Sequence, residues 1–159
     1  MKVAVYAGSF DPFTYGHLDI LKRSAEIFDK VLVAIAYNPD KKCILNYEER
    51  VNVIKKCTKS LSNIEVYSFD GLTVDFAKKH KASVLIRGLR NSADFEYENQ
   101  LAQINLSLNK NIQTFFMVSK PEYSFISSSA VRELILHKCD LKDFVPPEAA
   151  KYLRKKFDY

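Results

Sequence analysis

Short apolar runs alternate along the chain with segments whose apolar residues recur every three or four positions. The runs have the length and the β-branched content of buried strands. They fall at residues 3–7, 31–36, 64–69, 83–86 and 114–118. Strands that alternate with helices at this spacing form βαβ units, which build a parallel sheet with helices on both faces. The pattern predicts an α/β fold with a single Rossmann-like, doubly wound, five-stranded parallel sheet.

Each segment between the strands carries one apolar face, as an amphipathic helix does. The apolar positions are Leu18, Leu21, Ala25 and Phe28 in the first segment, Val51, Ile54 and Leu61 in the second, Val74 and Ala77 in the third, and Tyr97, Leu101, Ile104 and Leu108 in the fourth. A further helix is expected at residues 130–137. Residues 147–156 form a last amphipathic helix, which we expect to pack on a single domain spanning residues 1–159.

The composition indicates an ordinary globular chain. A length of 159 residues suits one domain, and 47% hydrophobic with 27% charged residues argues against disorder. No apolar run approaches the ~20 residues that span a bilayer, and the N-terminus shows no signal-peptide pattern. We therefore expect a cytoplasmic protein without a membrane partner. The three cysteines are widely spaced with no C-x-x-C pair, which fits reduced thiols and offers no metal site.

The charge balance leaves two kinds of partner open. A net charge of +5 allows nucleic acid, and it equally allows a pocket for small polyanions. The lysines occur in scattered pairs rather than in one stripe, and no nucleic-acid motif is visible. The pattern favours small anionic ligands over nucleic acid.

The residues that follow the predicted strands point to one binding edge. In open parallel sheets, ligands bind beyond the carboxyl ends of the strands. Gly8, Gly71 and Gly88 follow predicted strands, and Gly16 precedes the first helix. Several cations share these loops: Lys41, Lys42, Arg87, Arg90 and Lys120. We expect a single polyanion-binding cleft at this edge.

The first of these loops combines a strand, a glycine-bearing turn and a helix start. Such an arrangement suits an anionic group, because free N–H groups and the helix dipole point at it. Gly8 and Gly16 are expected where the backbone approaches something closely or takes a positive φ. His17 falls on the first turn of the helix. A lone histidine is more often structural than catalytic, but this position favours a donor toward a phosphoryl oxygen.

The sequence Thr14-Tyr15-Gly16-His17 follows Gly8-Ser9-Phe10-Asp11-Pro12. This stretch resembles the H-x-G-H signature of the nucleotidyltransferase superfamily, in the T-x-G-H form of the phosphopantetheine adenylyltransferase family. Two further stretches are similar to that family: residues 87–90 (Arg-Gly-Leu-Arg) with 93–98 (Ala-Asp-Phe-Glu-Tyr-Glu), and residues 126–129 (Ile-Ser-Ser-Ser). The motifs lie in order from residue 3 to about residue 145.

The resemblance implies a role for each matching position. His17 would be the transition-state stabiliser, with Ser9 and Lys41 also in the catalytic set. The acceptor substrate would be held by Ser9, Lys41, Thr73 and Arg87. ATP would be held by Ser9, Phe10, His17, Gly88, Leu89, Arg90, Glu98, Tyr123, Ser124, Phe125, Ile126, Ser127, Ser128 and Ser129. Tyr123 stands where many members carry Trp. No metal ligand is implied.

Several of these residues could also have a role that needs no contact with a phosphate. Arg87 ends an apolar run, where a guanidinium needs an anionic partner, either a ligand phosphate or a carboxylate of the protein. Glu98 would repel a triphosphate, so contact with a sugar hydroxyl or the positioning of an arginine is more favourable. Serines at a helix start are commonly N-caps. Lys41 and Lys42 could be a solvated loop.

The implied reaction converts ATP and 4′-phosphopantetheine reversibly to 3′-dephospho-coenzyme A and pyrophosphate, a step of coenzyme A biosynthesis. The resemblance further implies Mg²⁺ with the triphosphate, inhibition by coenzyme A, and a homohexamer with contacts through residues 94–108. The alternatives are a superfamily member with another acceptor or with CTP, a nucleic-acid-binding module, and a catalytically silent ligand sensor.

Overall fold

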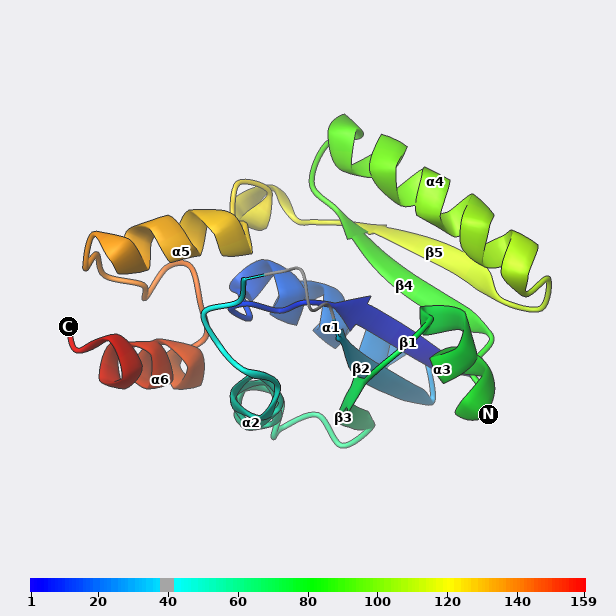
Figure 1. Ribbon diagram of the computed structural model, residues 1–159, viewed down its shortest axis with the longest axis horizontal. Coiled ribbons are helices and arrows are strands. Elements are labelled where there is room, and N and C mark those ends of the chain that lie inside the picture. The colour runs from blue at the N-terminus through cyan, green and yellow to red at the C-terminus, as the bar shows by residue number, and fades with distance from the viewer. Residues whose placement is uncertain (38–41) are drawn as a thin grey trace.

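The computed structural model describes residues 1–37 and 42–159. Its centre is a sheet in which every neighbouring pair of strands is parallel (Figure 1). The five strands are β1 (Val3–Gly8), β2 (Lys30–Ala36), β3 (Ile64–Phe69), β4 (Val84–Leu89) and β5 (Gln113–Val118), in the order β3-β2-β1-β4-β5. The predicted α/β class and the five-stranded parallel sheet are confirmed.

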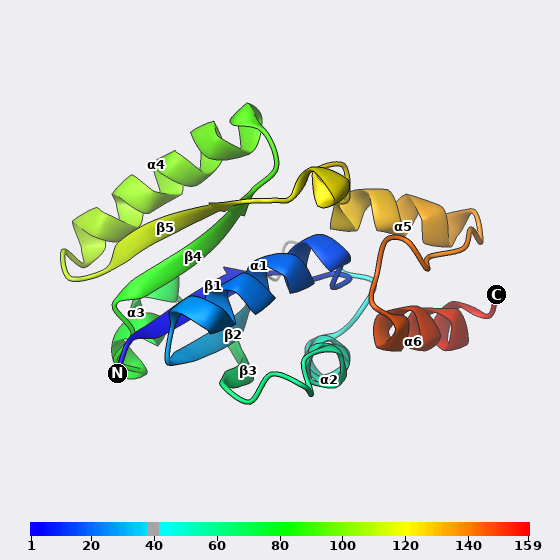
Figure 2. The same cartoon turned by 180° about the vertical axis from the view of Figure 1, so that it is seen from behind.

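Helices cover both faces of the sheet. They are α1 (Tyr15–Ile27), α2 (Tyr47–Cys57), α3 (Thr73–Lys79), α4 (Ser92–Leu108), α5 (Ser128–Leu136) and α6 (Pro147–Phe157), with a short 3₁₀ turn at Pro121–Tyr123. α3 and α4 lie in front of the sheet in Figure 1, and α1 lies in front of it in the reverse view of Figure 2. The sheet is therefore the middle layer of three.

The strand order creates a crevice at the carboxyl ends of β1 and β4. From β1 the chain proceeds to β2 and β3 on one side, and it returns to place β4 and β5 on the other. β1 and β4 are direct neighbours, with Ala4 opposite Val84 and Tyr6 opposite Ile86. In a doubly wound sheet, ligands bind at the point where the strand order reverses.

Two apolar layers hold the helices to the sheet. On one face, Tyr6, Val33 and Ile86 pack with Leu21 of α1 and Ile54 of α2. On the other face, the strands pack against α3. The inward side chains of this second layer include Val5, Leu32, Leu85, Val74, Phe76 and Ala77. Both faces of the sheet are apolar because both are covered, as expected for a parallel sheet.

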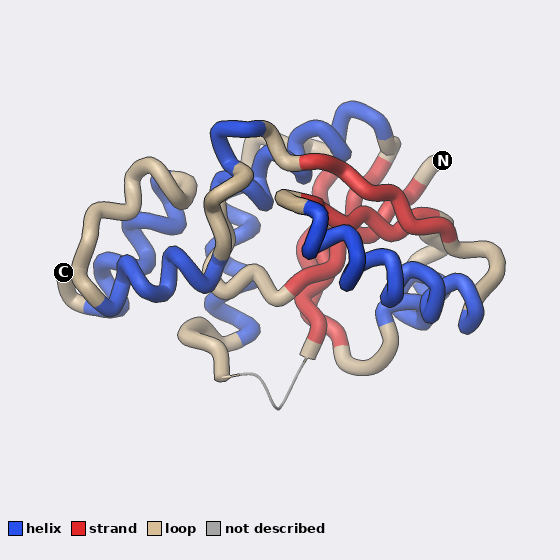
Figure 3. The backbone as a smooth tube through the Cα atoms, turned by 90° about the horizontal axis from the view of Figure 1, so that it is seen from above, coloured by secondary structure: helices blue, strands red, loops and turns tan. Residues whose placement is uncertain are grey.

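The C-terminal part of the chain forms a third cluster beyond the sheet. Val131 of α5 and Leu153 of α6 are buried together with Val53 of α2. Figure 3 shows these helices at the end of the molecule that carries the C-terminus. The last helix thus packs on α2, where Glu49 accepts hydrogen bonds from Tyr152 and Lys156.

Several predicted boundaries are wrong. Gly8 was expected after the first strand but is the last residue of β1, and α5 begins at Ser128 rather than at residue 130. Arg87 and Gly88 were expected in a loop, but β4 continues through Leu89, because Arg87 and Gly88 stay paired with Phe116 and Met117 of β5. Leu61 was expected on the second helix, but α2 ends at Cys57. An apolar pattern does not reveal where β4 ends, since that depends on its pairing with β5.

α4 is a helix, as its spacing predicts, but its apolar stripe is not part of the core. No residue of α4 is buried. Tyr97, Ile104 and Leu108 are 62%, 54% and 54% exposed. Phe115 and Val118 of the neighbouring edge strand β5 are also exposed. Phe115 packs against Phe28 on the face of the sheet that α1 covers, whereas Phe116 packs against Phe95 of α4 on the other face. Exposed apolar side chains therefore occur on α4 and on the edge strand β5.

Candidate active site

A cavity of about 330 Å³ lies at the carboxyl ends of β1 and β4. It is bounded by the β1–α1 turn, the end of β4, the start of α4 and the start of α5. The structure brings eleven of the predicted site residues to its wall: Ser9, Phe10, His17, Arg87, Gly88, Arg90, Glu98, Ile126, Ser127, Ser128 and Ser129. Residues far apart in the sequence therefore share one site, at the edge of the sheet where a single cleft was expected.

The β1–α1 turn has a left-handed residue that is not a glycine. Phe10 has φ 48°, a conformation that costs a residue with a Cβ free energy and is held by its surroundings. Gly8 does not have a positive φ, but a Cβ there would come within 3.0 Å of the Phe10 ring. Gly8 was expected either to take a positive φ or to allow a close approach of other atoms to the backbone. The structure shows the second, with the Phe10 ring as the group that approaches.

His17 lies on the first turn of α1 and forms a reciprocal cap with Thr14. The backbone N–H of Thr14 donates to Nδ1 of His17 over 3.0 Å. Thr14 Oγ1 accepts a hydrogen bond from the N–H of His17 over 3.3 Å. The His17 ring packs edge-on against Phe10 and stacks on Phe13. The imidazole is thus oriented by backbone and by two aromatic rings.

These contacts determine the charge and the tautomer of His17. Burial, with a smaller contribution from the cations Arg90 and Arg87, lowers the pKa of His17 to about 3. The ring is therefore neutral near pH 7. Because Nδ1 accepts the hydrogen bond from Thr14, the ring proton lies on Nε2. His17 can donate one hydrogen bond through Nε2–H, and it is not an acid or base poised for neutral pH.

The first turn of α1 offers fewer free N–H groups than expected. The N–H of Tyr15 donates to the carbonyl of Phe144, and the N–H of His17 is taken by Thr14. At the start of α5, the N–H of Ala130 is likewise capped by Ser127. Some of the N–H groups at these two helix starts are thus used within the protein, and the side chains of the cavity add to what remains for an anion.

Arg87 is held by Glu98 in a two-point ion pair. Its Nε and Nη2 donate to Oε2 and Oε1 of Glu98 over 2.5 and 2.6 Å, and its Nη1 donates to the carbonyl of Ala7 over 2.6 Å. Of the two anionic partners considered for Arg87, a ligand phosphate or a carboxylate of the protein, the structure shows the carboxylate. The position of Glu98 is the one that an arginine-positioning role requires. The remaining N–H donors of the guanidinium stay available to a ligand.

Two further arginines reach the cavity. Arg90 pairs with Asp94 at the start of α4, with Nε 2.9 Å from Oδ2. Arg132 lies on α5 and donates to the carbonyl of Asp11 and to Ser129 Oγ. The cavity wall thus carries three guanidinium groups, each oriented by a protein oxygen. Such a set suits a ligand with several phosphate groups, since guanidinium N–H groups match phosphate oxygens.

The three consecutive serines have different partners. Ser127 is the N-cap of α5 and accepts from Ala130 N over 3.0 Å. Ser128 Oγ donates to the carbonyl of Pro12 over 2.9 Å, and Ser129 Oγ accepts from Arg132. The hydroxyl of Ser127 is used as a cap, while those of Ser128 and Ser129 connect α5 to the β1–α1 turn and to a cation.

Other predicted site residues lie beside this cavity rather than on its wall. Thr73 lines a second cavity of about 110 Å³, which shares Arg87 and Glu98 with the first. Tyr123 stacks on Tyr15 near the start of α1. Leu89 is buried, Phe125 is exposed, and Ser124 Oγ donates to Pro121 O. Lys41 lies outside the described residues.

Sequence reasoning missed Arg132 and Asp94, which both line the cavity. Arg132 lies three positions after Ser129, so it belongs on the same face of a helix. Asp94 lies four positions after Arg90, the spacing of a helical ion pair. Both spacings are visible in the sequence and could have revealed these residues.

The comparisons with known proteins agree with this geometry. The cytidylyltransferase-like family model matches residues 5–134. A phosphopantetheine adenylyltransferase of Clostridium perfringens is 49% identical over 156 residues, covering 98% of this chain and 95% of the relative. One of Caldanaerobacter subterraneus is 48% identical over 157 residues, covering 99% of this chain and 98% of the relative. The chain belongs to the phosphopantetheine adenylyltransferase family.

A solved structure also shares the fold of this chain. A Vibrio parahaemolyticus protein provisionally named nicotinate-nucleotide adenylyltransferase superposes with a TM-score of 0.78 and 18% identity, covering 99% of this chain and 94% of that one. At this identity the likeness concerns the fold alone. The family membership predicted from the T-x-G-H stretch is confirmed by the curated relatives.

Proposed function

We propose that this chain is a pantetheine-phosphate adenylyltransferase, which transfers the adenylyl group of ATP to 4′-phosphopantetheine and releases pyrophosphate. One observation carries the proposal: a neutral His17, with its ring proton on Nε2, shares a cavity with Arg87, Arg90 and Arg132. The family membership supports it, because the relatives are named phosphopantetheine adenylyltransferases over nearly their full length.

The phosphate of the acceptor attacks the α-phosphorus of ATP in line. A phosphate monoester is already ionised near pH 7, so no side chain has to remove a proton. Catalysis then comes from alignment and from stabilisation of the charge that develops on the α-phosphoryl oxygens. His17 supplies that stabilisation through Nε2–H. A histidine with a low pKa stays neutral near pH 7, so it keeps Nδ1 as an acceptor and offers Nε2–H as its single donor.

The other residues of the cavity bind the two substrates on either side of His17. We assign Arg87 to the acceptor phosphate, since its guanidinium also borders the second cavity, where Thr73 lies. Arg90, Arg132 and the hydroxyls of Ser128 and Ser129 would hold the leaving pyrophosphate. The reaction should also run in reverse, because groups that stabilise the transition state lower the barrier in both directions.

We also propose that Mg²⁺ enters with ATP. Among residues 1–37 and 42–159, no group of three His, Cys, Asp or Glu side chains lies close enough together to hold a metal ion. Oxygen ligands from the triphosphate and from water suit Mg²⁺, which keeps part of its hydration shell in such sites. Bound there, the ion would neutralise phosphate charge. The arginines do the same from the protein side.

The exposed stripe of α4 supports a homohexamer. Tyr97, Ile104 and Leu108 on α4 and Phe115 and Val118 on β5 remain uncovered in the single chain. Exposed apolar side chains on a helix and on the edge strand beside it are typical of surfaces that contact another protein. Light scattering at micromolar concentration should give about six times the mass of 18.3 kDa. A monomer would contradict the assembly.

The proposed substrates also suggest how the enzyme is regulated and where it works. Coenzyme A shares the phosphopantetheine portion of the acceptor, so we propose that it inhibits by binding in the same cleft. We propose a cytoplasmic location, because the reaction consumes ATP, which is supplied there. None of the helices formed by the described residues is both long and apolar enough to cross a membrane.

The decisive experiment measures pyrophosphate release with ATP and 4′-phosphopantetheine. Pantetheine without the phosphate is the matched control, and it should give no release because it lacks the nucleophile. Release with nicotinate mononucleotide, or with CTP and a phosphoalcohol, in place of this pair would assign the chain to another superfamily activity. Salt-dependent binding to RNA or DNA without ATP turnover would indicate a nucleic-acid-binding module.

A further inference from the structure

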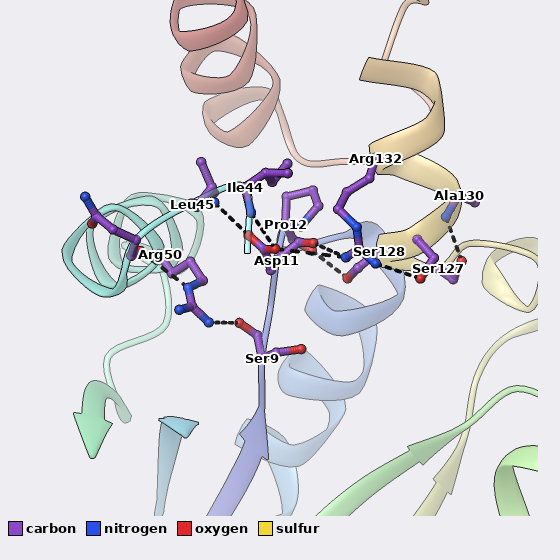
Figure 4. A network of polar contacts seen from close by, with 12 residues as sticks. Ser9, Asp11, Pro12, Ile44, Leu45, Arg50, Ser127, Ser128, Ala130 and Arg132 are labelled. Atoms are coloured by element: carbon purple, nitrogen blue, oxygen red, sulfur yellow. Dashed lines mark hydrogen bonds and ion pairs between the residues drawn. The ribbon is translucent and has the colours of Figure 1, made fainter. Parts of the chain in front are cut away.

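Asp11 is completely buried beside the cavity, although it is a charged residue. Its side chain is 0% exposed. Its two carboxylate oxygens accept hydrogen bonds from the backbone N–H groups of Ile44 and Leu45, each over 2.9 Å (Figure 4). Burying a carboxylate is costly unless it is hydrogen-bonded. These bonds therefore hold the segment that leads into α2 against the β1–α1 turn.

The backbone of the same residue is held from the opposite side. Nη1 of Arg132 donates to the carbonyl of Asp11 over 2.7 Å and lies 4.0 Å from its carboxylate. Nη2 of Arg132 donates to Ser129 Oγ, and Ser128 Oγ donates to the carbonyl of Pro12. Figure 4 shows Asp11 between the 44–45 segment and α5. One residue thus joins two elements that are distant in sequence.

A second arginine completes the arrangement. Arg50 of α2 is 2% exposed and donates to the carbonyl of Ser9 over 2.8 Å. The turn is therefore held through the carbonyls of Ser9, Asp11 and Pro12. Between them lies Phe10, with its φ of 48° and its ring against His17. A strained residue persists where its surroundings over-determine it, which the bonds on both sides of Phe10 do.

We propose that Asp11 is a positioning residue for the reaction. It takes no part in bond making, and it fixes the distance between His17 and the phosphate-binding serines of α5. The carboxylate anchors the turn to the 44–45 segment, the carbonyl receives Arg132, and Arg132 orients Ser129. Through Phe10 the same turn sets the imidazole. This proposal rests on the function proposed above, because it assumes that His17 and the serines act on one triphosphate.

The test combines Asp11→Asn, Arg132→Gln and the double variant. Asn has the shape of Asp but exchanges one acceptor oxygen for an amide that faces an N–H group. Asp11→Asn should lower kcat by about 10²-fold, the cost of a small misalignment, and leave the KM for ATP within about threefold. Arg132→Gln also removes a proposed phosphate contact and should raise the KM for ATP. The double variant should lose less kcat than the product of the two single losses, because part of the effect of Asp11 passes through Arg132. Asp143→Asn, an exposed aspartate, is the matched control and should keep wild-type kcat.

Either a near-normal kcat for Asp11→Asn or losses that multiply fully in the double variant would overturn the proposal. A structural role alone would lower the unfolding midpoint without moving the His17 ring signals. We expect those signals to shift in Asp11→Asn, as measured by NMR, and unchanged signals would also overturn the proposal. If wild-type protein releases no pyrophosphate with the proposed substrates, the function has failed, and the NMR measurement still decides the positioning role.

Discussion

Thr14 and His17 hold each other in place at the start of α1: the N–H of Thr14 donates to His17 Nδ1 over 3.0 Å, and Thr14 Oγ1 caps the N–H of His17 over 3.3 Å. The resemblance placed Thr14 where the wider superfamily has its first histidine. In this chain Thr14 instead orients His17, the second histidine of the motif. It selects the tautomer that presents Nε2–H to the cavity.

Replacing Thr14 should therefore affect both stability and rate. Thr14→Val keeps the shape but removes the hydroxyl, and the loss of an N-cap costs about 1 kcal/mol of unfolding free energy. kcat should also fall, because the imidazole loses part of its support. Thr14→Ser retains the hydroxyl and is the control, with both quantities close to wild type. Urea unfolding and steady-state kinetics measure the two effects, and equal behaviour of the variants would refute the capping role.

His17→Ala should reduce kcat far more than ATP affinity. Removing one donor to developing charge typically costs about 10²–10³-fold in kcat. The KM for ATP should change little, because the arginines and serines remain. His137→Ala, an exposed histidine at the end of α5, is the matched control. Near-normal kcat in His17→Ala would remove His17 from the transition-state role.

The pH dependence of His17 should be unusual for a histidine. With a pKa near 3 in the folded protein against an ordinary value of 6.5, the ring stays neutral while the same ring in the unfolded chain takes up a proton. Between these values the unfolded state binds more protons, so His17 should make the protein less stable as pH falls from about 6.5 toward about 3. His17→Gln should show a shallower loss in acid unfolding.

NMR of the imidazole nitrogens tests the same point directly. We expect a non-protonated Nδ1 and a protonated Nε2 that persist from pH 8 to about pH 5. The His17→Gln spectrum assigns the signals. A ring that gains a second proton with a midpoint near 6.5 would contradict the neutral donor.

Much of the fold was accessible from the sequence, since burial alone produces the pattern of apolar runs and faces. The site was accessible in part. Gly8, His17 and Arg90 carry local signals, but the pairing of Arg87 with Glu98 depends on how α4 lies against β4. The connection from Asp11 to Arg132 spans 121 positions. No local pattern encodes such a contact, because it arises only when both elements reach the same edge of the sheet.

The Arg87–Glu98 pair leads to a prediction that separates two roles for Glu98. Glu98→Gln keeps the size of the side chain but removes the charge that holds the guanidinium. If Glu98 positions Arg87, the KM for 4′-phosphopantetheine should rise by about tenfold, which corresponds to ~1.4 kcal/mol. The KM for ATP should then change little. Glu96→Gln, on an exposed position of the same helix, is the control. A rise confined to the KM for ATP would instead indicate a contact between Glu98 and the nucleotide.

Replacing Ser127 and Ser129 by alanine, one at a time, should have different effects on stability and on activity. Ser127→Ala removes the N-cap of α5, so it should lower the unfolding free energy by about 1 kcal/mol. Ser129→Ala leaves the cap intact but releases Arg132, so its effect should fall on kcat/KM for ATP, with a smaller change in stability. The two variants are each other's controls in urea unfolding and in pyrophosphate release. If both lost activity and stability in equal measure, the serines would act as one structural turn. A division of the two effects would show that a cap and a phosphate contact lie side by side at the start of one helix.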